Sequence, residues 1–171
     1  RIGRDWQNPT GSSAFIPQNS TVIFDGNIPA QGQFIYGSTH FNIFELQQHA
    51  DNYLRINDGS LVVVNKFDWT SGTIEVESGH FIAYDLLDNR LTGNWKLYQS
   101  GQISLSDENA IGLGGNLTIY GGTFSLSGGE SYYSYWPFGD NASLTMSGGV
   151  LELNNQSVFI RQDQNFTFTS N

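Results

Sequence analysis

Apolar and polar residues alternate along the chain in short stretches that follow one template. Each stretch has two apolar residues separated by one position, then a glycine, then two more alternating apolar residues. Residues 116–126 show it most clearly, with Leu117 and Ile119 before Gly122 and with Phe124 and Leu126 after it. A period of two is that of a β-strand with one buried face, and a glycine between two strands is typical of a tight turn or a close backbone approach. The template therefore predicts two short strands joined by a tight turn.

The template recurs at a nearly fixed period. Its glycines are 20, 22, 21 and 27 residues apart. The copy at Gly101 fits only on its C-terminal side, and Trp95 and Leu97 stand one residue out of register before it, which predicts a bulge. The other copies place Leu54, Ile56, Leu61 and Val63 around Gly59, Ile74, Val76, Phe81 and Ala83 around Gly79, and Leu144, Met146, Leu151 and Leu153 around Gly149.

Such a period predicts an all-β fold of stacked coils, a right-handed parallel β-helix (β-solenoid) of about 21 residues per coil. An antiparallel β-sandwich is the alternative, since it also consists of short strands separated by frequent turns. Sandwich strands have no reason to share one template, so the recurrence in register from residue 54 to residue 153 favours the solenoid.

The 171 residues are expected to form a single domain. Residues 1–52 are interpreted as an N-terminal cap with irregular first coils, in which 21–25, 33–36 and 40–46 are strand-like. Regular coils are expected over 53–157 and terminal strands over 158–171. We interpret the start at Arg1 as a processed N-terminus.

Charge and composition exclude several classes of partner. The net charge is −9 with two lysines, so nucleic acid and anionic membrane surfaces would be repelled. No apolar run approaches the roughly 20 residues of a membrane helix. The absence of cysteine excludes disulfides and thiolate metal sites. Richness in Asn, Ser, Thr and Gly favours an exported protein, located outside the cell or on its surface.

Two acidic groups are candidates for chemistry. Glu75 and Glu77 flank Val76, so a strand would direct both carboxylates outward about 7 Å apart. That separation is compatible with paired acid and base groups acting on a glycosidic bond, but a solvated strand face produces it equally. Asp85, Asp88 and Asn89 follow downstream and could supply oxygen ligands to calcium, although Asx turns explain them as well.

The longest interval between template glycines contains an aromatic cluster. It exceeds the 21-residue coil by six residues (27 − 21), and insertions in solenoids form loops on one side, often the binding side. Tyrosine and tryptophan offer flat apolar area with polar edges for sugar rings or protein partners. The same residues could instead fold back over the scaffold. The candidate ligand-binding residues are Tyr132, Tyr133, Tyr135, Trp136 and Phe138.

Two phrases carry a family resemblance. Residues 121–129 (Gly-Gly-Thr-Phe-Ser-Leu-Ser-Gly-Gly) and 146–153 (Met-Ser-Gly-Gly-Val-Leu-Glu-Leu) resemble the Gly-Gly-x-Leu-x-Val repeats of exported bacterial parallel β-helix surface proteins, of the autotransporter-passenger and sorting-signal-bearing types. The resemblance implies an extracellular, mostly non-catalytic rod and assigns no functional residue.

The leading functional hypothesis is a non-enzymatic extracellular structural or adhesive β-solenoid without a cofactor. Unpaired strand edges at its ends could join further copies into a homo-oligomer or filament. The alternatives are a carbohydrate-binding module that uses the aromatic loop and a fragment of a carbohydrate-active enzyme that uses Glu75 and Glu77.

Overall fold

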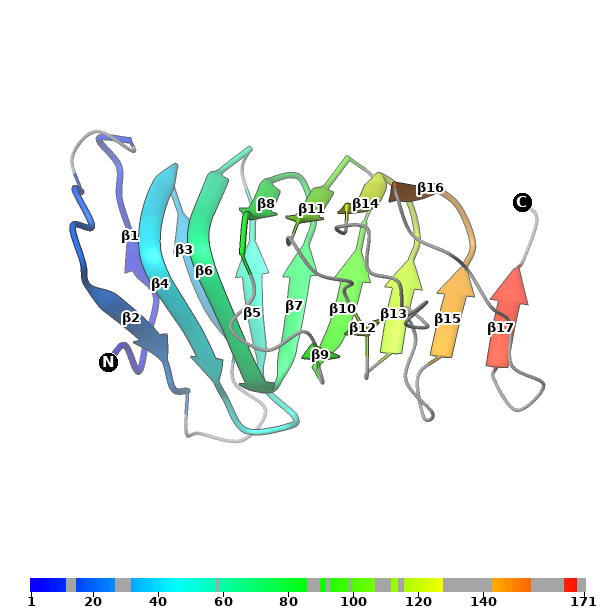
Figure 1. The fold of residues 1–171 in the computed structure, drawn as a ribbon, viewed down its shortest axis with the longest axis horizontal. Coiled ribbons are helices and arrows are strands. Elements are labelled where there is room, and N and C mark those ends of the chain that lie inside the picture. The colour runs from blue at the N-terminus through cyan, green and yellow to red at the C-terminus, as the bar shows by residue number, and fades with distance from the viewer. Residues whose placement is uncertain are drawn as a thin grey trace, which may run out of the picture.

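The computed structural model is a parallel β-solenoid whose coils of about 22 residues stack along one axis. The first described strand, residues 6–7, lies towards one end of the stack, and the last, residues 165–168, lies at the other (Figure 1). The residues that the structure describes are 1–11, 15–26, 32–57, 59–85, 90–91, 93–98, 100–106, 112–113, 116–127, 143–154 and 165–168.

Two large sheets form the walls of the solenoid. The first sheet has eight strands, in the order β1 (Trp6–Gln7), β3 (Gly32–Tyr36), β5 (Tyr53–Ile56), β7 (Thr73–Val76), β10 (Asn94–Leu97), β13 (Asn116–Ile119), β15 (Ser143–Met146) and β17 (Asn165–Phe168). The second has seven, in the order β16 (Val150–Asn154), β14 (Thr123–Ser127), β11 (Gln102–Ser106), β8 (His80–Ala83), β6 (Leu61–Ser71), β4 (Thr39–Gln47) and β2 (Thr21–Phe24). A small sheet pairs β9 (Arg90–Leu91) with β12 (Gly112–Leu113).

Every strand pairing in the described part of the chain is parallel. This confirms the predicted all-β parallel solenoid and excludes the antiparallel sandwich. The strand-like runs predicted before residue 53 are also strands, namely β2, β3 and β4. Residues 6–7 add β1 to the first sheet, within a segment that was expected to be irregular.

The core lies between the two large sheets and is built from the inward positions of successive coils. Ile74 is level with Trp95, and Trp95 is level with Leu117, so equivalent side chains stack from coil to coil. All three are at most 1% exposed. Burial of such apolar area contributes about 25 cal/mol per Å², which makes these columns the main source of stability. Further aromatic residues extend the contacts, including Phe44, Phe67, Phe81 and Phe124.

The template glycines are required where turns of neighbouring coils touch. Gly122 has φ of +73°, and a Cβ placed on it would lie 2.1 Å from the carbonyl oxygen of Gly101. A side chain is therefore excluded both by backbone conformation and by space. An added Cβ would also meet atoms of the preceding coil at Gly79, Gly101 and Gly149, whereas at Gly59 the space is open.

The inward residues of one template copy differ from the prediction. The pattern around Gly59 predicted Leu61 and Val63 as inward residues. In the structure Val62 and Val64 are fully buried, whereas Leu61 is 38% exposed. The prediction for this copy is wrong by one residue, and a shift of one residue exchanges the two faces of a strand.

Turn length explains this error and a second one. Three residues separate the consecutive strands at 77–79 and 120–122, but four residues separate them at 57–60 and 98–101. The extra residue at 57–60 moves the inward positions of β6 by one. The predicted bulge at Trp95 is also wrong, because β10 pairs in regular register with both neighbours and the additional residue lies in the turn after it.

The first residues of the chain close one end of the core. Ile2 forms a parallel bridge with Phe24, and the Trp6 ring lies 5.2 Å from that of Phe41 in an edge-to-face arrangement. Phe15 packs against the same two rings, at 5.0 Å from Trp6 and 6.0 Å from Phe41. The isolated aromatic residues of this segment therefore serve as anchors that cover the first coils.

Candidate functional site

A cluster of charged side chains occupies the outward face of the first sheet. Arg55 on β5 is level with Glu75 on β7, and Glu75 is level with Lys96 on β10. The three side chains point outward because the residues beside them in sequence, such as Ile74 and Val76, point into the core. Parallel register therefore places one carboxylate between two cations from adjacent coils.

Both oxygens of the Glu75 carboxylate accept hydrogen bonds from cationic donors. Arg55 donates from Nε and Nη2 to Oε2 at 3.0 and 2.6 Å, and Lys96 Nζ donates to Oε1 at 3.0 Å. Arg55 also pairs with Glu77, with 3.2 Å between Nη1 and Oε1. The four formal charges of this cluster, two positive and two negative, sum to zero.

The centre of the cluster is shielded from water although it faces outward. The Glu75 side chain is 4% exposed, compared with 26% for Arg55 and 40% for Lys96. Two aromatic rings flank the guanidinium of Arg55, whose central carbon lies 4.8 Å from the Tyr53 ring centre and 5.8 Å from that of Phe34. Such contacts stabilise a cation over an aromatic face.

The surroundings shift the pKa values of the cations and of a nearby tyrosine. The hydrogen bond to Glu75 raises the pKa of Lys96 and outweighs the opposing effect of burial. Burial lowers the pKa of Arg55, but the hydrogen bond and charge of Glu75, with that of Glu77, raise it overall. Burial, followed by the negative charge of Glu75, raises the pKa of Tyr98. All three groups keep their ordinary protonation state at neutral pH.

This geometry bears on the predicted carboxylate pair. Glu75 is buried rather than solvated, so the interpretation of residues 75 and 77 as a solvated face is wrong for Glu75. Its two oxygens are held by Arg55 and Lys96, and the carboxylate of Glu77 contacts the same arginine. These ion pairs link three successive coils. Both carboxylate oxygens of Glu75 are already hydrogen-bonded, so neither is free to contact a substrate.

An aromatic pair lies beside the cluster on the same face. The rings of Tyr98 and Tyr120 stack with 5.0 Å between their centres and 22° between their planes. Tyr120 is 48% exposed. Each tyrosine directly follows its strand, β10 or β13, so the pair borders the outward side chains of these strands.

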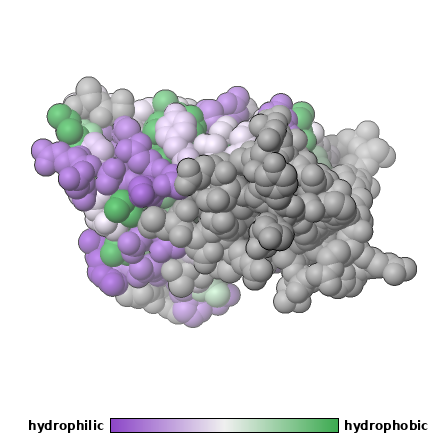
Figure 2. Space-filling view, viewed as in Figure 1, coloured by the Kyte–Doolittle hydropathy of each residue, from purple (hydrophilic) through white to green (hydrophobic). Residues whose placement is uncertain are grey.

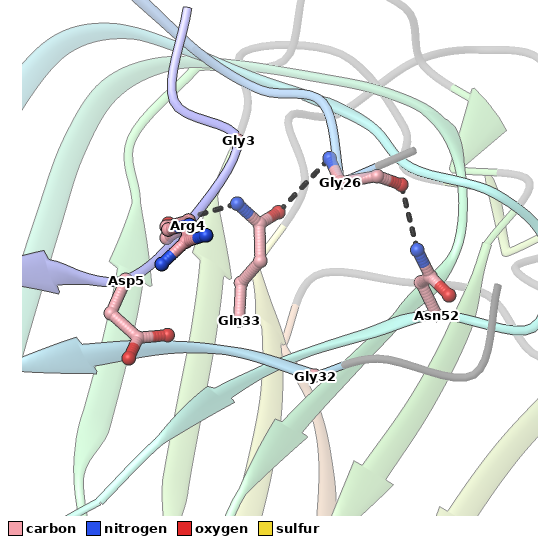
Figure 3. Close-up of a pocket in the computed structure, with 7 residues that line it drawn as sticks. All are labelled: Gly3, Arg4, Asp5, Gly26, Gly32, Gln33 and Asn52. Atoms are coloured by element: carbon pink, nitrogen blue, oxygen red, sulfur yellow. Dashed lines mark hydrogen bonds between the residues drawn. The ribbon is translucent and has the colours of Figure 1, made fainter. Parts of the chain in front are cut away.

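A polar cavity of about 370 Å³ lies at the N-terminal end of the solenoid (Figure 3). Gln33 donates from Nε2 to the carbonyl oxygens of Ile2 and Arg4 at 2.8 and 2.9 Å. Its Oε1 accepts from the backbone N–H of Gly26 at 3.2 Å, and Asn52 Nδ2 donates to the oxygen of Gly26 at 2.7 Å. The cavity is lined by Gly3, Arg4, Asp5, Gly26, Gly32, Gln33 and Asn52.

The amides beside this cavity are deeply buried. Gln33, Gln48 and Asn52 are at most 3% exposed, and Gln48 Nε2 donates to Gln33 Oε1 at 2.6 Å. Gln48 Oε1 and Asn52 Oδ1 are buried acceptors without a protein partner. The network joins side chains from β3 and from the connection between β4 and β5, so its first role is to hold the initial coils together.

The remaining predicted site residues are not brought together by the described structure. Asp85 pairs with Lys66, with 3.4 Å between Oδ2 and Nζ, while Asp88 and Asn89 lie outside the described residues. Within the described ranges no group of three or more His, Cys, Asp or Glu side chains could hold a metal ion. The five candidate aromatic residues between 132 and 138 also lie outside the described residues.

Sequence reasoning missed the partners of Glu75. Arg55 precedes it by 20 residues and Lys96 follows it by 21, which are the spacings of the template itself. A search for opposite charges one coil apart would therefore have found the cluster. The buried amides carry no such signal, because they lie in connections between strands.

The described surface is mostly polar on the face shown in Figure 2, where apolar residues are scattered among hydrophilic ones. Among the residues with described structure, no helix has the length and hydrophobicity to cross a membrane. No known protein family, no curated protein and no solved structure matches the chain, so its function has to be argued from its own geometry.

Proposed function

We propose that the chain is a non-enzymatic extracellular solenoid with a structural or adhesive role. The observation that carries this proposal is the cluster of Arg55, Glu75, Glu77 and Lys96, in which two carboxylates and two cations neutralise one another. A carboxylate that acts as a general acid or base exchanges a proton with its substrate, whereas both oxygens of Glu75 accept hydrogen bonds from cations. Its position instead stabilises the stacking of three coils.

A parallel solenoid is suited to adhesion because its backbone fixes where outward side chains stand. Neighbouring strands are about 4.8 Å apart, so equivalent side chains form columns along the first sheet. A ligand that meets such a prearranged surface loses less affinity to the ordering of side chains. Composition supports the extracellular location, since the chain is rich in Asn, Ser, Thr and Gly.

Bead retention under flow tests the adhesive role. Beads coated with the folded protein are passed over surfaces bearing polysaccharides or proteins, and beads coated with the heat-unfolded chain serve as the control for charge. We expect the folded protein to be retained more strongly on at least one surface. Equal retention of both bead types on every surface would contradict an adhesive role.

Turnover assays test the non-enzymatic part of the proposal. Neutral and acidic polysaccharides are incubated with the protein and with Glu75→Gln. We expect no release of reducing ends by either protein. Release by the unmodified chain that disappears in Glu75→Gln, while circular dichroism shows the variant to be folded, would show that the carboxylate is catalytic.

A further inference from the structure

Four uncharged polar side chains form a regular array on the outward face near the stacked tyrosines. Asn116 on β13 is level with Ser143 on β15, and Thr118 is level with Thr145. They face outward because the residues between them, Leu117 on β13 and Leu144 on β15, point into the core and are at most 2% exposed. We call these four residues, together with Tyr98 and Tyr120, the tyrosine shelf.

Hydrogen bonds fix the amide of the shelf in one orientation. Ser143 Oγ donates to Asn116 Oδ1 at 2.6 Å, and the backbone N–H of Asn116 donates to Asn94 Oδ1 at 3.0 Å. The Asn116 Nδ2 group remains available as a donor, since the described residues give it no acceptor. The hydroxyls of Thr118 and Thr145 likewise have no partner in the described part of the chain.

The stacked tyrosines form one border of this array. Tyr98 covers one face of the Tyr120 ring. Ser147 occupies the corresponding position after the next strand, β15, and its backbone N–H donates to the carbonyl oxygen of Ile119. Serine is too short to cover an aromatic ring. The second face of Tyr120 therefore lies beside the polar array with half of the residue exposed to solvent.

Charge restricts the ligand that this surface fits. The outward residues of β13 and of β15 carry no charge, and Lys96, which is level with Thr118, is paired with Glu75. The chain as a whole has a net charge of −9, which disfavours an anionic polymer. A protein interface would need an apolar centre, whereas the array presents hydroxyl and amide groups. Hydroxyl and amide groups beside an aromatic ring match an uncharged sugar chain.

We propose that the tyrosine shelf binds a neutral polysaccharide. The Tyr120 ring stacks on the apolar face of one sugar ring, while Asn116 Nδ2 and the hydroxyls of Thr118 and Thr145 bond to sugar hydroxyls. The proposal rests on the adhesive function proposed above and names the ligand class and the residues that would recognise it.

Affinity electrophoresis in gels containing polysaccharides provides the test. The probes are uncharged glucans, mannans and galactans, with a polyuronate as the acidic comparison. Tyr120→Ala removes the stacking ring, and Thr118→Val removes one hydroxyl with little change in volume. Tyr84→Ala is the matched control, because Tyr84 is a 55% exposed tyrosine that directly follows β8 of the other sheet.

We expect at least one neutral polysaccharide to retard the migration of the unmodified chain. Tyr120→Ala should lose at least tenfold in affinity and Thr118→Val should lose less. Tyr84→Ala should bind as the unmodified chain does. Thermal melts of all variants should agree within a few degrees. Unchanged binding in both shelf variants, or stronger binding to the polyuronate, would overturn the proposal. Bead retention only on protein-coated surfaces would refute the polysaccharide assignment and leave the adhesive role standing, whereas no retention on any surface would remove both.

Discussion

Replacing Glu75 by glutamine tests whether the charged cluster stabilises the solenoid. Glutamine keeps the size of the side chain but removes the negative charge that Arg55 and Lys96 share. Its amide N–H₂ would also face cationic donors that it cannot satisfy. We therefore expect Glu75→Gln to destabilise the fold while leaving the outline of the side chain unchanged.

The magnitude follows from burial. Removing one partner from a buried ion pair costs about 3–5 kcal/mol. Here the loss is reduced because the side chains of Arg55 and Lys96 are 26% and 40% exposed, so water can solvate them, and because Glu77 still contacts Arg55. We expect a decrease of about 2–3 kcal/mol in the free energy of unfolding, which corresponds to a fall of about 4–12 °C in Tm for a domain of this size.

Urea unfolding followed by circular dichroism, together with calorimetry, measures this change. Glu77→Gln is the matched control, because the Glu77 side chain is 39% exposed and, among the described residues, forms an ion pair with Arg55 only. A pair this exposed contributes about 0–1 kcal/mol. The reasoning is refuted if Glu75→Gln lowers stability by less than about 0.5 kcal/mol, or by no more than Glu77→Gln does.

Two further predictions concern a turn and a histidine. Gly122→Ala should lower the free energy of unfolding by about 3 kcal/mol in thermal or urea unfolding, because the added Cβ would meet the carbonyl oxygen of Gly101. Gly59→Ala should cost only about 1–2 kcal/mol, since φ is also positive there but the space is open. Equal losses would contradict the role of close packing. Burial lowers the pKa of His80 below its ordinary 6.5, so the folded state binds this proton less readily than the unfolded chain. The contribution of neutral His80 to stability should be present above pH 6.5 and lost as the pH falls below 6.5. His80→Gln should therefore flatten the plot of unfolding free energy against pH in this range. An unchanged slope would show that other groups cause the pH dependence.

The fold could be predicted because most coils repeat the same two sequence features, an alternation of apolar residues and a regularly spaced glycine. Alternation such as that of Leu117 and Ile119 defines a buried face, and a glycine at a fixed interval marks where coils touch. The face of β6 could not be predicted in this way. Its start, residues 61–64, reads Leu-Val-Val-Val, and four consecutive apolar residues contain no alternation from which to choose the inward pair.

The candidate site was only partly predictable. The pattern directed Glu75 outward correctly, but an outward carboxylate was expected to be solvated, and its burial depends on cations one coil before and one coil after it. The tyrosine shelf depends on register between coils that are 27 residues apart, which the regular period of 21 does not supply. Residues 132–138 depart from the repeat, so the repeat itself contains no information about their conformation.

That 27-residue coil also indicates how this architecture can change over evolution. β14 and β16 pair over five residues without interruption, as do β13 and β15 over four, although the chain between the coils has gained six residues over the regular interval (27 − 21). Additions between the second sheet and the next strand of the first sheet therefore leave the register intact. New segments can be acquired on one side of the solenoid and selected for new contacts while the scaffold stays constant. The same side is where a foreign peptide could be grafted.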